Sequence, residues 1–185
     1  MTLEQMTPQD WSYLADKAHR NAVAKGFYDQ TPSHDHLRML AICELVEAIE
    51  ADRKGRRAVV SEEIDDYVDE AFVTDFNARI KDTVEDELAD FIIRCLDYVG
   101  WRRATYDWGE LEISLDFYQP DEWRKVEGIA EMSYYAISEL ISLSVTYALE
   151  CVLSYCQFAG IDIMRHVELK MRYNELRPRL HGKKY

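Results

Sequence analysis

Apolar residues recur three or four positions apart along most of the chain, the spacing that places them on one face of a helix. The first such stripe lies in residues 8–25 and consists of Trp11, Leu14, Ala15, Ala18, Ala22 and Val23. Thr7, Pro8 and Asp10 are the residue types of a capped helix start, and Gly26 favours a helix end. The sequence therefore predicts an amphipathic helix over this range.

Five further segments follow the same rule, namely residues 34–54, 61–78, 82–99, 122–158 and 163–176. Ser33 and Asp162 predict capped starts, and Gly55, Gly100 and Pro178 predict ends. Between the helices, Leu111, Ile113, Leu115 and Phe117 alternate with polar residues, which predicts a short strand or extended segment. The predicted fold is an all-α helical bundle with one long helix over residues 122–158.

Two glutamates interrupt the apolar pattern of residues 34–54. Glu44 and Glu47 are one helical turn apart, on the stripe that also carries Ala41 and Ala48. Both carboxylates are therefore expected to turn toward the interior. Because an unpaired buried carboxylate costs several kcal/mol, a cation or hydrogen-bond donors must compensate them.

A second acidic pair, Glu87 and Asp90, repeats this spacing in residues 82–99. If the two helices are antiparallel neighbours, four carboxylates supply hard oxygen ligands, which suit Mg²⁺ or Mn²⁺ better than Zn²⁺. A ferritin-like di-iron bundle needs a Glu followed three residues later by His. None of the five histidines has a Glu at that position, so we favour a magnesium site.

Composition narrows the class of protein. The 185 residues are 48% apolar and contain no evident linker, which predicts a single domain over residues 1–185. A net charge of −13 argues against nucleic acid or an anionic membrane as partner. Glu139 and Glu150 interrupt the longest apolar stretch, which is then too short to span a bilayer. The four cysteines lack zinc-site spacing and predict buried thiols in a reducing, cytoplasmic environment.

The charge is unevenly distributed. Residues 61–90 hold twelve acids and two bases, whereas residues 165–185 hold seven Lys or Arg and two acids. An acidic region opposed by a basic ending is what a metal-bound polyphosphate requires.

The acid pairs and the basic ending together resemble the MazG-like all-α nucleoside triphosphate pyrophosphohydrolases, whose signature is an E-x-x-E helix followed by an E-x-x-D helix. The matching words are ELVEAIEADR at residues 44–53 and EDELADFIIR at residues 85–94. A third is KMRYNELRP at residues 170–178, followed by HGKKY. The resemblance covers about half the chain, and relative to that family residues 101–160 are an insertion.

The resemblance implies Mg²⁺-dependent hydrolysis of a nucleoside triphosphate to the monophosphate and pyrophosphate. It implies a metal-binding set of Glu44, Glu47, Glu87 and Asp90, with Glu47 the favoured catalytic base and Glu44 the other catalytic candidate. It also implies a substrate-binding set of Lys170, Asn174, Arg177, Lys183, Lys184 and Tyr185. Some relatives carry a further Glu where this chain has Cys43, which leaves the number of metal ions open.

Two other functions and one assembly fit the same residues. A nucleotide- or metal-binding regulatory protein of this fold, without turnover, would keep the acid pairs, and so would a purely structural bundle. The excess of apolar residues in residues 122–158 predicts a homo-oligomer, with a homodimer favoured.

Overall fold

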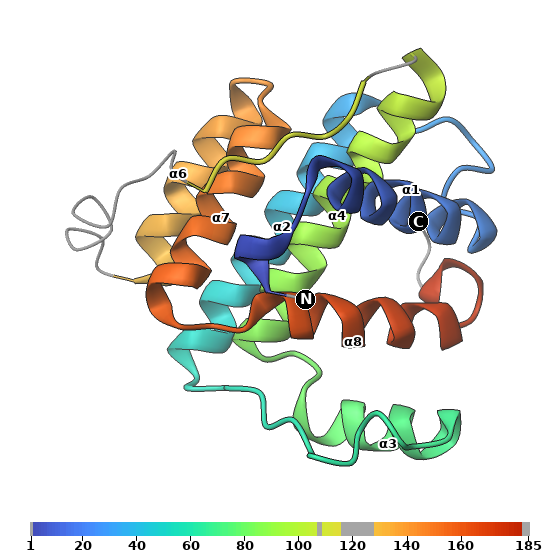
Figure 1. Ribbon diagram of the computed structural model, residues 1–185, viewed down its shortest axis with the longest axis vertical. Coiled ribbons are helices and arrows are strands. Elements are labelled where there is room, and N and C mark those ends of the chain that lie inside the picture. Colours follow the sequence, from blue (N-terminus) through green and yellow to red (C-terminus); the bar gives the residue numbers. More distant parts are fainter. Residues whose placement is uncertain (1, 107–108, 116–127, 183–185) are drawn as a thin grey trace.

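The computed structural model describes residues 2–106, 109–115 and 128–182. Within these ranges the chain is all-helical, without a strand (Figure 1). The elements are η1 (Leu3–Gln5), α1 (Pro8–Ala24), α2 (His34–Arg53), α3 (Asp69–Arg79), α4 (Val84–Tyr106), α6 (Ile129–Ile141), α7 (Val145–Ala159), α8 (Ile163–Leu176) and η2 (Arg179–Gly182). The predicted all-α fold is confirmed.

Helix α4 lies at the centre of the bundle, where it packs against α1, α2, α7 and α8. Its inward positions Leu88, Phe91, Ile92 and Leu96 are fully buried. Helices α2 and α4 run antiparallel, since the chain descends through α2 and ascends through α4 in Figure 1. The two helices that carry the acid pairs are therefore neighbours, as expected.

Local sequence sets the helix boundaries where a cap is present. The Thr7 hydroxyl accepts a hydrogen bond from the Asp10 backbone N–H at 3.2 Å, and the Asp10 carboxylate accepts one from the Thr7 N–H at 2.9 Å. Ser33 Oγ accepts from the His36 N–H at 3.1 Å at the start of α2. Asp162 Oδ1 accepts from Arg165 N–H at the start of α8. These three predicted starts are confirmed.

Gly100 does not end the helix as predicted, because α4 continues to Tyr106. A Cβ atom built on Gly100 would lie 2.3 Å from the carbonyl oxygen of Ala15 on α1. The glycine is thus needed for the close approach of two helix backbones, a role that spacing along one chain segment does not reveal.

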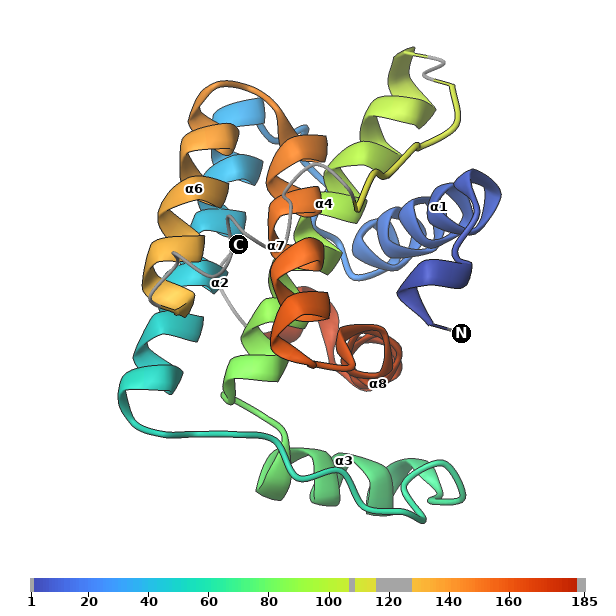
Figure 2. The ribbon, with the colours of Figure 1, turned by 60° about the vertical axis from the view of Figure 1, so that its left-hand side comes forward.

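The predicted long helix over residues 122–158 is wrong. The described part is a pair of helices, α6 and α7, which pack side by side (Figure 2). Leu143 adopts a left-handed φ of 71° between them, and the Ser144 hydroxyl caps α7. Both helices are apolar on two faces because α6 covers α2 while α7 contacts α4 and α8. Residues 122–127 lie outside the described ranges.

The predicted strand is not present in the described residues of its range. Residues 109–114 follow α4 as a connection without helix or strand, and Glu150 Oε1 accepts a hydrogen bond from the Ser114 N–H at 2.7 Å. Residues 116–117 lie outside the described ranges.

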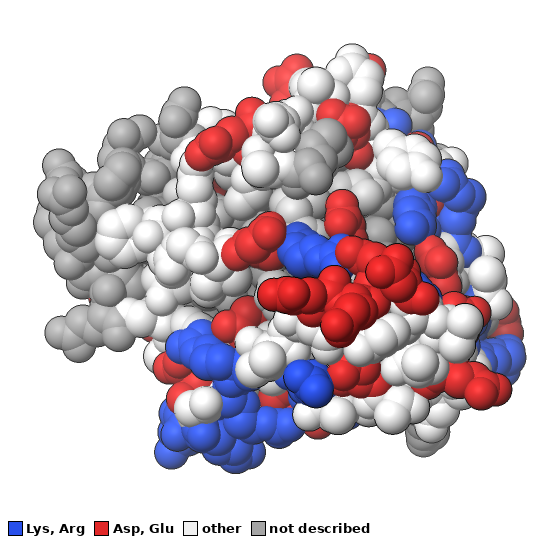
Figure 3. All heavy atoms as spheres, turned by 60° about the horizontal axis from the view of Figure 1, so that its bottom comes forward, with Lys and Arg blue, Asp and Glu red and all other residues white. Residues whose placement is uncertain are grey.

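Helix α3 forms a small second core against α8, at the edge of the bundle (Figure 2). The predicted helix over residues 61–78 is correct only from Asp69 onward, since residues 61–68 form turns. Ile64 is buried in that core, which explains the apparent helical periodicity. The turns and the start of α3 carry exposed acids, namely Glu62, Glu63, Asp65, Asp66, Asp69 and Glu70. Figure 3 shows acidic side chains gathered on one face of the molecule.

In the described ranges, the helices are all too short or too polar to cross a membrane.

Candidate functional site

Antiparallel packing of α2 and α4 brings three of the four predicted acids together. Glu44 and Glu47 of α2 and Glu87 of α4 each offer a carboxylate oxygen, and these oxygens lie within 4.8 Å of one another. The group joins two segments that are forty residues apart in sequence. It is the arrangement that the spacing of the acid pairs predicts.

Burial divides this group. Glu44 and Glu87 are each only 4% exposed, whereas Glu47 is exposed. The expectation that both acids of α2 turn inward is therefore wrong for Glu47. Leu45 and Ala48 occupy the fully buried face of α2, so Glu47 lies at the edge of the interface and reaches the group from solvent.

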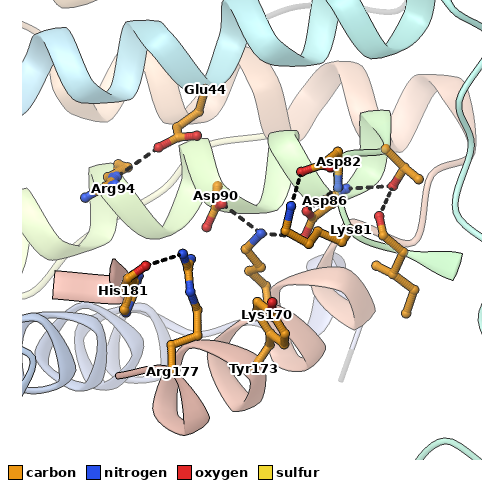
Figure 4. A network of polar contacts seen from close by, with 12 residues as sticks. Glu44, Lys81, Asp82, Asp86, Asp90, Arg94, Lys170, Tyr173, Arg177 and His181 are labelled. Atoms are coloured by element: carbon orange, nitrogen blue, oxygen red, sulfur yellow. Dashed lines mark hydrogen bonds and ion pairs between the residues drawn. The ribbon is translucent and has the colours of Figure 1, made fainter. Parts of the chain in front are cut away.

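Asp90, the fourth acid, is held by a cation from α8. Lys170 Nζ lies 2.8 Å from Asp90 Oδ2 and 2.7 Å from Asp86 Oδ1 (Figure 4). Asp90 is not among the three acids whose oxygens converge. The sequence predicts that Lys170 binds substrate, and in the structure Lys170 contacts two carboxylates of α4.

The ammonium group of Lys170 is well enclosed. The residue is 3% exposed, and Nζ lies 5.6 Å from the ring centroid of Phe76 on α3 and 5.8 Å from that of Tyr173 on α8. The two rings stack at 4.2 Å. The small core of α3 and α8 thus forms an aromatic wall beside the cation, which stabilises its positive charge.

Arg94 supplies a second cation, one turn after Asp90. Its Nε donates a hydrogen bond to Glu44 Oε1 at 3.1 Å (Figure 4), and its guanidinium carbon lies 5.7 Å from the ring centroid of Phe27. Glu44 is therefore paired on one side while it faces Glu47 and Glu87 on the other.

The carboxylates retain protons more strongly than isolated acids do. Burial, followed by repulsion from Asp86 and Asp90, raises the pKa of Glu87 to about 8. Burial and Asp90 raise the pKa of Glu44 to about 7, against the opposing effect of Arg94. Burial raises the pKa of Asp86 to about 6, although Lys170 opposes this shift. Burial also acts to raise the pKa of Asp90, but Lys170, Arg94 and Arg177 together outweigh it and the net shift is downward.

The chemistry of this donor set fits Mg²⁺ or Mn²⁺. Glu44, Glu47 and Glu87 offer only carboxylate oxygens, and no histidine or cysteine belongs to either metal-capable group in the described ranges. Asp82, Asp86 and Glu87 form a second, overlapping group of converging oxygens. Glu87 is common to both groups, so it is the acid around which a cation would be held.

Two further residues of α8 lie near Asp90. Asn174 is 4% exposed and its Oδ1 has no hydrogen-bond partner among the described residues. Arg177 Nη2 donates to the carbonyl of His181 at 3.0 Å (Figure 4). Asn174, Arg177 and His181 line a small cavity of about 40 Å³ together with Asp90 and Arg94. Lys183, Lys184 and Tyr185 lie outside the described ranges.

A larger cavity of about 740 Å³ adjoins the acids through Cys43 and Arg94. It lies between the first half of α2 and the segment from Gly26 to Pro32, with Arg179 and Leu180 at its edge. Phe27, Leu37, Met39 and Leu40 give it apolar walls, while His36 and Asp97 add polar groups. Its size and mixed lining suit a nucleoside-sized molecule.

Arg94 and Asp86 belong to the site but not to the set predicted from the sequence, although the sequence contains a signal for each. Arg94 is four positions after Asp90, on the same face of α4, and Asp86 directly precedes Glu87. A cation on the acidic face of a helix indicates internal charge compensation. Which acid it compensates depends on the packing of α2 and α8, which the spacing does not give.

Comparison of the chain with models of protein families, with curated proteins and with solved structures finds no match in any of the three.

Proposed function

We propose that this chain is a Mg²⁺-dependent nucleoside triphosphate pyrophosphohydrolase, which cleaves a nucleoside triphosphate or deoxynucleoside triphosphate to the monophosphate and pyrophosphate. The observation that carries the proposal is the convergence of Glu44, Glu47 and Glu87 from two antiparallel helices. The resemblance of the surrounding words to the MazG-like enzymes supplies the reaction.

The acids take different roles in this proposal. Glu44 and Glu87, which are buried, and Asp90, which lies one turn after Glu87, would hold the metal together with Glu47. A bound Mg²⁺ neutralises phosphate oxygens and the charge that develops during phosphoanhydride cleavage. Glu47 is the favoured base because its exposed carboxylate is accessible to the attacking water, which a fully buried acid is not.

The substrate would extend from the large cavity to the acids. The base and sugar occupy the cavity beside Phe27 and Leu37, and the phosphates pass Arg94 toward the stripe of Lys170, Asn174 and Arg177 on α8. The guanidinium groups of Arg94 and Arg177 supply hydrogen-bond donors to the phosphate oxygens along this path. Lys183, Lys184 and Tyr185 remain candidates on sequence alone.

The test is incubation of the purified chain with a panel of ribo- and deoxynucleoside triphosphates and Mg²⁺. We expect release of pyrophosphate and a monophosphate, and loss of both on addition of a chelator. Glu47→Gln should lose turnover by at least about a hundredfold. The matched control is Glu50→Gln, one turn further along α2, because Glu50 is exposed and pairs only with Arg53 and Lys54 among the described residues.

Two results would contradict the proposal in different ways. Nucleotide binding without any product would favour a regulatory binding protein of the same fold. Equal turnover by Glu47→Gln and the unaltered chain would show that the converging acids do not perform the reaction.

A homodimer is the second part of the proposal. Tyr134 and Ile141 of α6 and Leu143 of the α6–α7 turn are 68%, 69% and 68% exposed, a high fraction for apolar side chains. A second copy of the chain would cover them. Light scattering that gives the mass of one chain, 21.7 kDa, at micromolar concentration would contradict this assembly.

A further inference from the structure

Lys170 occupies an unusual position for a residue that is expected to bind substrate. Its ammonium lies between Asp86 and Asp90, at 2.7 and 2.8 Å, and the side chains of all three residues are largely removed from water. Side-chain exposures of 4%, 1% and 19% for Lys170, Asp86 and Asp90 show that this is an interior ion pair, not a surface contact. Removing either partner from such a pair leaves an uncompensated charge.

The position of Asp90 follows from this contact. Its Oδ2 is bound to the lysine, and its carboxylate is absent from both groups of converging oxygens, although Glu87 one turn earlier belongs to both. The ammonium thus neutralises the one predicted metal ligand that does not belong to a converging group. Asp86, in contrast, contacts Lys170 and still belongs to one of the groups.

The surroundings of Lys170 offer it an alternative partner. Lys170 and Asn174 lie on one face of α8, four positions apart, and Arg177 directly follows the helix. Figure 4 shows Lys170 and Arg177 both reaching toward the acids of α4. An anion bound along this stripe would attract the ammonium, because a polyphosphate carries several negative charges and Asp90 carries one.

We propose that Lys170 is a positioning residue that withholds Asp90 from the metal until a polyphosphate draws the ammonium away. Metal and polyphosphate then bind with positive coupling, because the anion releases the fourth carboxylate. The inference rests on the proposed function for the identity of the metal and the anion. It goes beyond that function in two ways. It gives Lys170 a second partner, the polyphosphate, and it states the order in which the anion and the fourth carboxylate join the site.

The experiment measures Mn²⁺ affinity by calorimetry, or by the spin-resonance signal of free Mn²⁺, without nucleotide. Four chains form a cycle, namely the unaltered chain, Lys170→Met, Asp90→Asn and the double variant. In the unaltered chain, Asp90→Asn should weaken Mn²⁺ binding by less than about threefold, since Asp90 is withheld. In the Lys170→Met background the same change should weaken it by roughly tenfold or more, because Asp90 is then a ligand.

Inorganic tripolyphosphate provides the second arm. With it present, Asp90→Asn should weaken Mn²⁺ binding by roughly tenfold even when Lys170 is intact. An equal effect of Asp90→Asn with and without the anion would overturn the proposal. So would a large effect of Asp90→Asn on the otherwise unaltered chain without anion, a measurement that needs no variant of Lys170 to fold.

Lys81→Met is the matched control. Lys81 pairs with Asp82 at 2.6 Å, beside the same acidic region, and has no contact with Asp90. It should change Mn²⁺ affinity by the same factor whether residue 90 is Asp or Asn. If Lys170→Met does not fold, as circular dichroism would reveal, Lys170→Gln replaces it in the cycle.

The two proposals fail separately. Coupling between Lys170 and Asp90 in Mn²⁺ binding, without hydrolysis of any nucleotide, would leave the positioning role intact and contradict the enzyme. Hydrolysis without the coupling would do the opposite.

Discussion

The two halves of α4 bury acidic side chains in different ways. In the second half, Asp97 is almost alone: Tyr28 Oη donates to its Oδ1 at 2.9 Å, and His19 Nδ1 lies 3.0 Å from the same oxygen. In the first half, Asp86, Glu87 and Asp90 lie together and face Glu44 of α2, with Lys170 and Arg94 as the adjacent cations.

The difference distinguishes a structural acid from a candidate ligand. Burial raises the pKa of Asp97, and its hydrogen bonds with His19 of α1 and with Tyr28 of the following segment oppose that rise. The four acids of the first group, Glu44, Asp86, Glu87 and Asp90, carry more negative charge than Lys170 and Arg94 can neutralise. The Glu87 side chain, moreover, has neither a hydrogen bond nor an ion pair among the described residues. A buried carboxylate that the fold does not satisfy is poorly explained by stability alone and indicates a site for an external cation.

The largest expected effect is on turnover, from a change in the first half of α4. Glu87→Gln keeps the shape of the side chain and removes the charge common to both groups of oxygens. We expect pyrophosphate release to fall by at least about a hundredfold, since the metal loses its central ligand. Steady-state rates over a range of Mg²⁺ concentrations measure this.

The control is Glu62→Gln, an exposed acid that belongs to neither group of converging oxygens. It should retain turnover within about twofold. Comparable losses in the two variants would mean that general negative charge, and not the converging group, supports the reaction.

The second prediction concerns the packing that holds the second half of α4. Gly100→Ala would place a methyl group 2.3 Å from the Ala15 carbonyl oxygen and 2.7 Å from the His19 Cβ. Because two backbones must separate, we expect a loss of about 2 to 3 kcal/mol in the free energy of unfolding. Urea unfolding measures it. Gly109→Ala, with no atom within 4 Å of the added methyl, should leave stability nearly unchanged and would reveal any general effect of replacing glycine.

The sequence predicts local helix caps better than it predicts contacts between helices. Helix starts with local caps, such as Thr7 with Asp10, were predictable because their hydrogen bonds join residues three apart. Because glycine commonly ends a helix, the sequence predicts that the helix ends at Gly100. Its actual contact is with Ala15, and no pattern within α4 indicates which element crosses there.

For the candidate site, too, the sequence predicts the acids but not the contacts that depend on how the helices cross. The acid pairs and their antiparallel helices follow from spacing, and the structure brings Glu44, Glu47 and Glu87 together. The pairing of Lys170 with Asp86 and Asp90 joins residues that are eighty or more positions apart, and it depends on how α8 crosses α4. The sequence does not predict the break between α6 and α7, because apolar residues on two faces of the predicted helix over residues 122–158 conceal the interruption at Leu143.

The third prediction concerns the pH dependence of stability in the metal-free protein. Folding raises the pKa of Glu87 from an ordinary value of 4.5 to about 8, so the folded chain keeps a proton that the unfolded chain has released. The free energy of unfolding should therefore fall as the pH rises through this interval. Glu44 and Asp86, with pKa values of about 7 and about 6, act in the same direction.

Glu87→Gln should remove part of this slope, on the order of 2 kcal/mol between about pH 5 and about pH 8. Urea unfolding with a chelator at several pH values measures the slope for both chains. Addition of Mg²⁺ should restore stability at the higher pH in the unaltered chain only. Parallel slopes for the two chains would mean that Glu87 is already compensated, and the contrast between the halves of α4 would disappear.

The smallest effect is expected for Asp97→Asn, in the half of α4 where the buried acid has hydrogen-bond partners. Asp97→Asn keeps an oxygen that can accept from Tyr28 and His19. It removes a charge that burial already disfavours, since burial raises the pKa of Asp97, so we expect a cost below about 1 kcal/mol at neutral pH. Asp97→Ala removes the acceptor from both partners and should cost about 3 kcal/mol. Glu87→Gln, in contrast, should stabilise the metal-free chain, because neutralising one of several adjacent acids relieves repulsion. Urea unfolding of the three variants, in one buffer that contains a chelator, measures the change in the free energy of unfolding for each. Stabilisation by Asp97→Asn would place Asp97 among the uncompensated acids, and the second half of α4 would then need the same search for a cation as the first.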